Sequence, residues 1–488
     1  SLLNFLLYYF GYSSDISKCY LRILVDALTA DLRLMIWFKD PKTKLKPIVY
    51  RRYTMDFGDA CSALVVRITQ KKLLCPRARL ESTKHTIISG GYADNYSNSF
   101  PSRQEYLEVT KDMEEIHASI GLPLKATYTS IQTDPRILEK LEKEDEAEPT
   151  YSFLGISWNL RKNSILPLTY FNLNKKVRGQ SGVKKLVDMK PAEYTTPEFR
   201  MGICRRILSR LTAQCYDRVG FLLGPLTSGL KILTSRSTEI SDANHLDTPI
   251  EQTDKGYVNT CVKFLKNIPR LKELVPFSKA LVPAGNKIFA IGSMGDGGVP
   301  GYSTSRYVAS QDKDGNTTSR ICGTKGRVSK RTIPAHEALS RALQGEETRK
   351  LAMVLSHRPE LTNINLKVMM GGDSICVASL FNPKVEMRNV LLRSAILSCK
   401  DKCLEIMKLF PKAEIQLCWL DGSKNAADTM SKLHFDPVSI INSTLYRNGP
   451  KELFMDSEEK VVFYRFTEGK EEWIPLPEKL IQRAKQES

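Results

Sequence analysis

The sequence predicts an α+β protein followed by an α/β domain, and three observations support this fold class. Apolar strands and amphipathic helices alternate up to about residue 123. Basic helical segments follow from Thr196, and a fresh alternation of strands and helices begins at Lys287. We therefore expect three domains and a C-terminal extension, with the bounds 1–190, 191–285, 286–435 and 436–488.

The first region centres on the segment Tyr92-Ala93-Asp94-Asn95. An apolar strand is predicted before it over Thr86–Ser89, and a helix after it from about Pro101. That helix carries an apolar face, which is made by Val109, Met113, Ile116 and Ile120. We expect it to back a hairpin whose tip presents Asp94, where an acid beside an aromatic residue can hold a metal ion.

A second acid of this region, Asp15, lies on an apolar segment with an aromatic residue, Tyr20, five positions later. Two such acids can form the core of a two-metal site for nucleotide addition. Taken alone, Asp15 is equally an acid at a strand edge, and Tyr20 is more often a core residue.

The middle region contains a basic helix. Thr196 is a suitable helix cap and Pro197 suits the first turn. The helix would carry the basic side chains of Arg200, Arg205, Arg206 and Arg210. These arginines could follow a phosphate backbone, and a solvated helix face is an equally fair interpretation.

The last region contains four acids in different local settings. Asp296 follows the first strand, Glu337 lies early in a helix opened by Ile333-Pro334, Asp373 follows a strand over 364–370, and Asp428 begins a helix. Individually they could be a turn residue, a helix-surface acid and two helix caps. Acids at strand ends and helix starts can also converge above one sheet, where their repulsion would require divalent cations.

Composition narrows the class of partner. The chain has 72 Lys and Arg against 54 Asp and Glu, so its net charge is +18. Nucleic acid is the first partner that this charge favours, and an acidic membrane surface is the second. No apolar run approaches the ~20 residues of a membrane span. Eleven cysteines without a paired metal motif indicate reduced thiols in the cytoplasm, and Cys399 and Cys403 lack partners for a zinc site.

The order of these motifs resembles the reverse transcriptase–ribonuclease H segment of a BEL/Pao-type LTR retrotransposon polyprotein. Eight segments and a C-terminal stretch carry the resemblance, in the order Ser14-Asp15-Ile16, 57–62, 92–95, 153–158, 216–225, 332–337, 372–374, 425–428 and 442–450. The resemblance implies a polymerase palm, a helical thumb and connector, and an α/β ribonuclease H-like domain.

For the first half, the resemblance implies that Asp15 and Asp94 bind two magnesium ions. Tyr20 would be the steric gate against a ribose 2′-hydroxyl. Further nucleotide contacts would come from Phe57, Gly58, Tyr92 and Asn95, and the primer grip from Leu154 and Gly155. The partners would be an RNA template, a DNA primer and dNTPs.

For the second half, the resemblance implies a ribonuclease H site with two magnesium ions, or manganese, on Asp296, Glu337, Asp373 and Asp428. Phosphate contacts to an RNA–DNA hybrid would come from Lys325, Arg327, Lys330 and Arg331. The protein would act in a cytoplasmic retrotransposon particle, with protease and integrase as possible products of the same polyprotein.

Two departures from the family pattern define the alternatives. The family's hairpin usually ends in two aspartates, and here the second is Asn95. Losing a carboxylate beside a divalent cation costs on the order of a few kcal/mol, so metal affinity would fall about a hundredfold. Fourteen residues precede Asp15, so the fingers would be largely missing. The alternatives are a truncated element with only ribonuclease H activity and a domesticated nucleic-acid-binding protein without catalysis.

Overall fold

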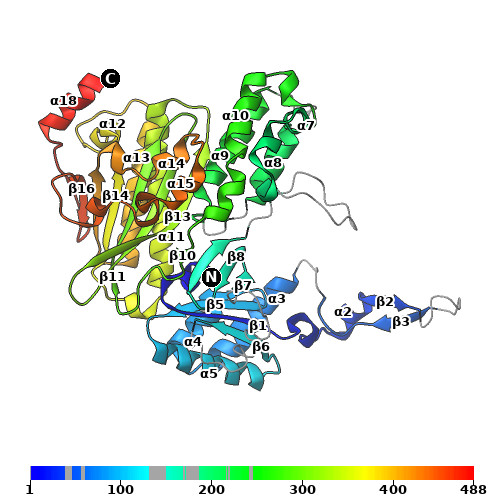
Figure 1. Ribbon diagram of the computed structural model, residues 1–488. Helices are drawn as coiled ribbons and strands as arrows, with labels where there is room; N and C mark the ends of the chain where they lie inside the picture. Colours follow the sequence, from blue (N-terminus) through cyan, green and yellow to red (C-terminus); the bar gives the residue numbers. More distant parts are fainter. Residues whose placement is uncertain are drawn as a thin grey trace. The chain divides into compact units, whose positions relative to one another are not determined.

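The computed structural model describes residues 2–38, 47–56, 61–130, 150–168, 171, 186–215, 217, 220–240 and 246–487. The chain forms two compact units, Ser1–Ala147 and Glu148–Ser488 (Figure 1). The predicted nucleotide contacts Phe57 and Gly58 lie outside the described residues. The mixed α/β character that the sequence predicts is confirmed.

The first unit is built on a four-stranded antiparallel sheet with the order β4-β5-β1-β6. Its strands are β1 (Phe10–Ile16), β4 (Gly91–Tyr92), β5 (Asn95–Phe100) and β6 (Leu124–Thr129). Its helices are α1 (Leu2–Leu7), α2 (Ala27–Asp31), α3 (Ser62–Thr69), α4 (Glu81–His85) and α5 (Arg103–Ser119). A separate two-stranded ribbon joins β2 (Leu34–Trp37) to β3 (Ile48–Arg51).

The predicted helix that backs the hairpin is α5. The Ser102 side chain caps it by accepting a hydrogen bond from the Glu105 amide at 3.2 Å, a cap worth about 1 kcal/mol. Val109 and Met113 are buried against Tyr12 of β1 and Tyr96 of β5 in one core. The apolar face of α5 therefore fixes the sheet from which the acids project.

The strand predicted over Thr86–Ser89 is wrong. This segment continues α4 as a further helical turn, Thr86–Gly90. The hydroxyl of its first residue, Thr86, donates to the carbonyl of Ser82, one helical turn earlier, at 2.8 Å. A short apolar run cannot distinguish a buried helix turn from a strand by periodicity alone.

The second unit begins with a small antiparallel sheet of order β10-β9-β8-β7. Its strands are β7 (Thr150–Phe153), β8 (Ile156–Asn159), β9 (Ser164–Pro167) and β10 (Phe277–Ser278). Leu154 and Gly155 form the turn between β7 and β8, both with positive φ. Because β9 pairs with β10, the predicted primer-grip residues lie in the second unit, although the sequence assigns them to a domain over 1–190.

A group of helices follows in the second unit, with bounds α7 (Pro197–Met201), α8 (Arg205–Gln214), α9 (Gly224–Ile240) and α10 (Lys255–Leu265) (Figure 1). Thr196 caps α7 as predicted, with its hydroxyl accepting from the Phe199 amide. The single basic helix is wrong, because α7 ends before Gly202 and α8 starts afresh. Tertiary hydrogen bonds at Ile203 and Arg206 hold the chain in this break.

The main sheet of the second unit has seven strands in the order β13-β12-β11-β14-β15-β16-β17. Strands β11, β14 and β15 are parallel, and the other pairs are antiparallel. The strand bounds are β11 (Lys287–Gly297), β12 (Gly301–Gln311), β13 (Thr317–Val328), β14 (Lys367–Gly372), β15 (Glu414–Trp419), β16 (Val461–Thr467) and β17 (Lys470–Trp473). The region predicted as a C-terminal extension thus supplies two strands of this sheet.

Two long helices accompany the main sheet, α11 (Ile333–Ser356) and α13 (Val390–Leu409), and α11 packs on both β11 and α13 (Figure 1). Shorter helices are α12 (Ile375–Ser379), α14 (Asp428–Ser431), α15 (Pro437–Asn442), α16 (Thr444–Asn448), α17 (Lys451–Phe454) and α18 (Glu478–Glu487). All eleven cysteines are free thiols. Among the described residues, the helices are too short or too polar to cross a membrane.

Candidate active sites

The main sheet brings Asp296 and Asp373 side by side. In the parallel pair of β11 and β14, Met294 lies opposite Gly371, and each acid comes two residues after its member of this pair. The two carboxylates are joined by one amide, since Asn425 Nδ2 donates to Asp373 Oδ1 at 3.0 Å and to Asp296 Oδ1 at 3.3 Å. The register therefore places two predicted metal ligands at the same edge of the sheet.

Glu337 reaches this edge because α11 approaches β11 closely. A Cβ atom at Gly297 would lie 2.2 Å from the Glu337 amide, so only glycine permits this approach. Glu337 Oε2 accepts a hydrogen bond from Ser374 Oγ at 2.6 Å. Ser374 follows Asp373 directly and caps α12, so the third acid is tied to the loop that carries the second.

Asp428 is the first residue of α14, and basic side chains that follow it in sequence lie close to it. Lys432 Nζ pairs with Asp428 Oδ1, and His434 Nε2 lies 3.7 Å from Asp428 Oδ2. Ser431, on the same short helix, donates its hydroxyl to Asp296 Oδ2. The α14 turn therefore touches the carboxylate pair at the sheet edge.

The pKa values of three of these acids show that their charges interact. Burial, and then the nearby Asp373 and Asp428, raise the pKa of Asp296 to about 7. Burial is also the main cause that raises the pKa of Asp373 and of Glu337, with Asp428 and Asp373 as the respective acidic neighbours. Repulsion among buried carboxylates is the condition that a divalent cation relieves.

The donor set suits a magnesium ion in chemistry, since all four side chains offer carboxylate oxygens. In the arrangement described, each acid is held by an amide, a hydroxyl or an ammonium group. The described part of the chain accordingly contains no cluster of three or more His, Cys, Asp or Glu side chains spaced to hold a metal ion.

The sequence analysis missed the residues that support this site. Arg341 is buried behind it, donates to the Met370 carbonyl at 3.2 Å, and attracts both Asp373 and Glu337. Arg341 follows Glu337 by four residues on α11, and this spacing in the sequence could have indicated that the two side chains lie on the same face of the helix. Asn425, Ser431 and Lys432 surround the fourth acid in sequence, but their contacts with Asp296 and Asp373 depend on tertiary structure.

The first unit brings Asp15 and Asp94 together where the end of β1 pairs with the start of β5. Asp15 pairs with Asn95 in the antiparallel register, and the Ile16 amide donates to the Asp94 carbonyl at 2.9 Å. Burial and then Asp94 raise the pKa of Asp15, whereas Lys125, 3.9 Å from Asp15 Oδ2, opposes the shift. The two predicted acids of this unit are therefore close enough for the charge of Asp94 to raise the pKa of Asp15.

The turn that carries Asp94 is as predicted, a tight β4–β5 hairpin. Ala93 has a positive φ of 50°, and its carbonyl accepts from Gln70 Nε2 at 2.9 Å. Asn95 Nδ2 donates to Asp94 Oδ1 at 3.3 Å. Tyr92 is exposed, and Tyr20 lies near enough for Asp94 to raise its pKa, after burial as the larger cause.

Several of the predicted basic contacts form ion pairs within the protein. Arg200 binds Glu251 at 2.7 Å, Arg206 binds Asp247 at 2.6 Å, and Lys330 lies 3.1 Å from Glu239. Lys325 and Arg327 lie exposed on β13 with no ion pair to any described residue. Arg205 and Arg210 lie on α8, and Arg331 lies just before α11. At least three of the eight side chains are thus engaged within the protein.

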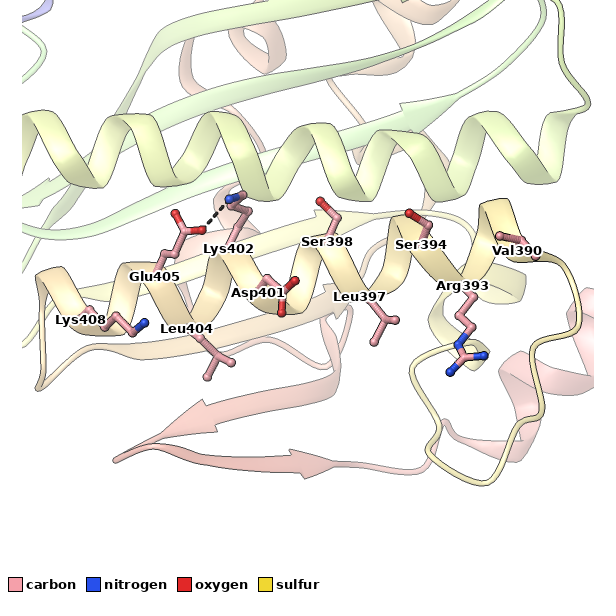
Figure 2. Close-up of a pocket in the computed structure, with 10 residues that line it drawn as sticks. All are labelled: Val390, Arg393, Ser394, Leu397, Ser398, Asp401, Lys402, Leu404, Glu405 and Lys408. Carbon is pink, nitrogen blue, oxygen red and sulfur yellow. Dashed lines mark hydrogen bonds and ion pairs between the residues drawn. The ribbon is translucent and has the colours of Figure 1, made fainter.

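A different hollow, of about 770 Å³, follows the outer side of α13. Figure 2 shows its mixed lining, in which Asp401 and Leu397 point away from the neighbouring helix and Lys402 bonds to Glu405. Its lining residues include none of the predicted site residues. Asp401 is therefore a suitable control acid within the second unit.

Comparison with known proteins was made at the level of sequence and of structure. No family model matches the chain, and no curated protein is recognisably similar to it. Among solved structures, ribonuclease H1 from Halobacterium salinarum NRC-1 is similar over 29% of this chain and 93% of its own, with 13% identity and a TM-score of 0.20.

Two further solved structures are similar. The N-terminal ribonuclease H domain of rv2228c from Mycobacterium tuberculosis, fused to maltose binding protein, matches 31% of this chain and 94% of its own, with 12% identity and a TM-score of 0.21. The foamy viral protease-reverse transcriptase in complex with RNA/DNA hybrid matches 86% of this chain, with 11% identity and a TM-score of 0.40. Our chain spans 45% of the length of that viral protein.

Proposed function

We propose that the second unit is a metal-dependent nuclease that cleaves the RNA strand of an RNA–DNA hybrid. The observation that supports this most strongly is that Asp296 and Asp373 lie at the ends of adjacent parallel strands and are bridged by Asn425, with Glu337 and Asp428 in electrostatic contact. Two carboxylates that repel each other in a buried setting are poised to share divalent cations.

In this proposal, Asp296 and Asp373 hold the ions from the sheet, and Glu337 and Asp428 complete the set from α11 and α14. The two magnesium ions would activate a water molecule and stabilise the departing oxygen of the RNA strand. Asn425 holds the two central carboxylates close together by donating to both. Arg341 fixes the carboxyl end of β14 through its bond to Met370 and so keeps Asp373 in position.

The same proposal places the whole chain as the reverse transcriptase–ribonuclease H segment of a BEL/Pao-type retrotransposon polyprotein. Asp15 and Asp94, which interact electrostatically, would hold the ions for DNA synthesis, with Tyr20 and Tyr92 at the nucleotide. The template, the primer and dNTPs would be its partners. It would act in a cytoplasmic particle beside protease and integrase. With Asn95 neutral, synthesis would be the weaker activity.

The direct test is the Asp373→Asn variant, assayed on a hybrid with end-labelled RNA in magnesium. We expect cleavage to fall at least about a thousandfold, because the variant removes a carboxylate that would bind the ions. Hybrid binding should stay within about twofold. Asp401→Asn, an exposed change on α13, is the matched control and should cleave like the parent protein.

Two results would contradict the proposal. Equal cleavage by the Asp373→Asn and Asp401→Asn proteins would point to a contaminating nuclease. Hybrid binding without any cleavage by the parent protein in magnesium or manganese would favour the nucleic-acid-binding alternative without catalysis.

A further inference from the structure

A cavity of about 410 Å³ lies in the second unit, and none of the four acids lines it. Helix α9 contributes Thr227, Ser228 and Lys231, strand β13 contributes Thr324 and Lys325, and α11 contributes Lys350. Along α11, Glu347 lines the cavity ten residues after Glu337, which is about 15 Å along a helix. The cavity is therefore distinct from the carboxylate site.

The cavity holds more positive charge than its own acids neutralise. Lys231 is partly buried, and the desolvation and the like charges of Lys325 and Arg327 lower its pKa. Among the described residues, Lys231 and Lys325 form no ion pair. Holding such a lysine near two other cations without a partner costs stability, so its position indicates a ligand of opposite charge.

The two carboxylates that line the cavity are already engaged. Asp217 accepts from the Gly220 amide at 2.8 Å and from the Leu223 amide at 2.7 Å. Glu347 lies 3.2 Å from Arg306 NH1 and 3.0 Å from Lys350 Nζ. Glu347 is thus shared by two of the lining cations. The lining as a whole has four cations, Lys231, Arg306, Lys325 and Lys350, against two acids, so positive charge remains at the cavity.

The other groups suit an oxyanion. Gly224, Thr227, Ser228 and Lys231 share one face of α9, and the first turn of this 17-residue helix adds the positive end of its dipole. The Ser228 hydroxyl of α9 can donate to anionic oxygens, whereas the Thr324 hydroxyl of β13 donates to the Gly220 carbonyl. A Cβ at Gly326 would lie 2.5 Å from Ser228 Oγ, so glycine allows β13 and α9 to close around the cavity.

We propose that this cavity binds a phosphate group, with Lys231 and Lys325 as its charged contacts. The phosphate could belong to the backbone of a bound nucleic acid, which rests on the function proposed above, or to a free phosphate compound. In the first case the site would hold the hybrid several nucleotides from the cut. The cavity lies about 15 Å from Glu337 along α11, and one strand advances about 3.4 Å per nucleotide.

The test compares Lys231→Gln with Lys313→Gln, an exposed change at the tip between β12 and β13. Thermal unfolding is measured in sodium phosphate, in pyrophosphate and in sodium chloride of equal ionic strength. We expect both phosphates to raise the melting temperature of the parent and Lys313→Gln proteins, and to leave that of Lys231→Gln unchanged. Without phosphate, Lys231→Gln should melt no lower than the parent, because it removes a repelled cation.

The second arm measures hybrid binding against salt in an Asp373→Asn background, which prevents cleavage. If the phosphate is a backbone one, Lys231→Gln should bind about five- to tenfold more weakly near 0.1 M salt, and its slope of log K against log salt should be smaller by about one. Lys313→Gln should match the parent. An unchanged slope with a lost phosphate shift would assign the site to a free phosphate compound.

The proposal is overturned if phosphate and pyrophosphate stabilise the parent no more than chloride does and the Lys231→Gln slope equals that of Lys313→Gln. If the parent protein binds no hybrid, the proposed function fails. In that case the thermal unfolding experiment in phosphate and pyrophosphate still tests whether the cavity binds phosphate, because it needs no nucleic acid.

Discussion

The two acidic sites of this protein differ in how their carboxylates are held. In the second unit, Asp296 is 5% exposed and is bound by both an amide and a hydroxyl group. In the first unit, the Asp15 side chain is 30% exposed, and a lysine 3.9 Å away is its nearest cation. The buried site is preorganised and electrostatically strained, whereas the shallower one is neither to the same degree.

The two sites differ in burial and also in the residue that follows Asp94 in the hairpin, which is Asn95. Asn95 donates to Asp94 where a second carboxylate would repel it. An amide at this position stabilises the empty hairpin and reduces the negative charge available to a cation. Comparing the sites therefore teaches that a strained carboxylate cluster, and not the mere presence of two acids, is the stronger sign of metal-dependent chemistry.

The largest expected effect on stability belongs to Asp296. Its pKa is raised from 3.8 to about 7, so the folded protein binds the proton more tightly than the unfolded chain does. In metal-free buffer the unfolding free energy should fall as pH rises from about 4 to about 7, by at most about 4 kcal/mol from this group.

The variant Asp296→Asn should remove most of that pH dependence and should be more stable than the parent at pH 7 without metal. Chemical denaturation at pH 5 and pH 7.5 measures both effects. A parent protein whose stability rises over this range, or an Asp296→Asn variant with the same pH slope as the parent, would show that the carboxylates are not strained. Magnesium should stabilise the parent more than the variant, since bound cations favour the folded state.

The second prediction concerns the metal affinity of the first unit. The Asn95→Asp change restores a carboxylate beside Asp94 and should raise the affinity of the first unit for manganese about a hundredfold. Calorimetric titration in an Asp296→Asn, Asp373→Asn background isolates this unit. The control is the Asp296→Asn, Asp373→Asn protein that keeps Asn95, titrated in parallel. Equal affinities would place the weakness of this site elsewhere.

Much of the fold could be predicted from local sequence. The Ile333-Pro334 start of α11 and the apolar face of α5 are encoded by cap residues and by helical spacing, and both are present as predicted. The four acids of the second unit could be proposed because each has a recognisable strand-end or helix-start setting. Their roles as metal ligands remain predictions.

The features that could not be predicted depend on long-range pairing. Thr86–Gly90 is helical because its side chains pack against the core and hydrogen-bond to the preceding helical turn. Helix α7 ends at Met201 because the Ile203 carbonyl accepts a hydrogen bond from the amide of Ile250, far along the chain. The contact of Asn425 with two acids more than fifty residues before it leaves no local signal. The same is true of Lys231 and Lys325, which lie on different elements.

The measurement that tests the central claim most directly follows both activities in one sample. The parent protein, Asp94→Asn and Asp373→Asn are given a DNA primer on an RNA template with magnesium and dNTPs, and extension and RNA cleavage are quantified together. We predict strong cleavage that only Asp373→Asn abolishes, and weak extension that only Asp94→Asn removes. Robust extension with no RNA cleavage by the parent would contradict the account, because it would assign the chemistry to the shallow site and none to the buried one.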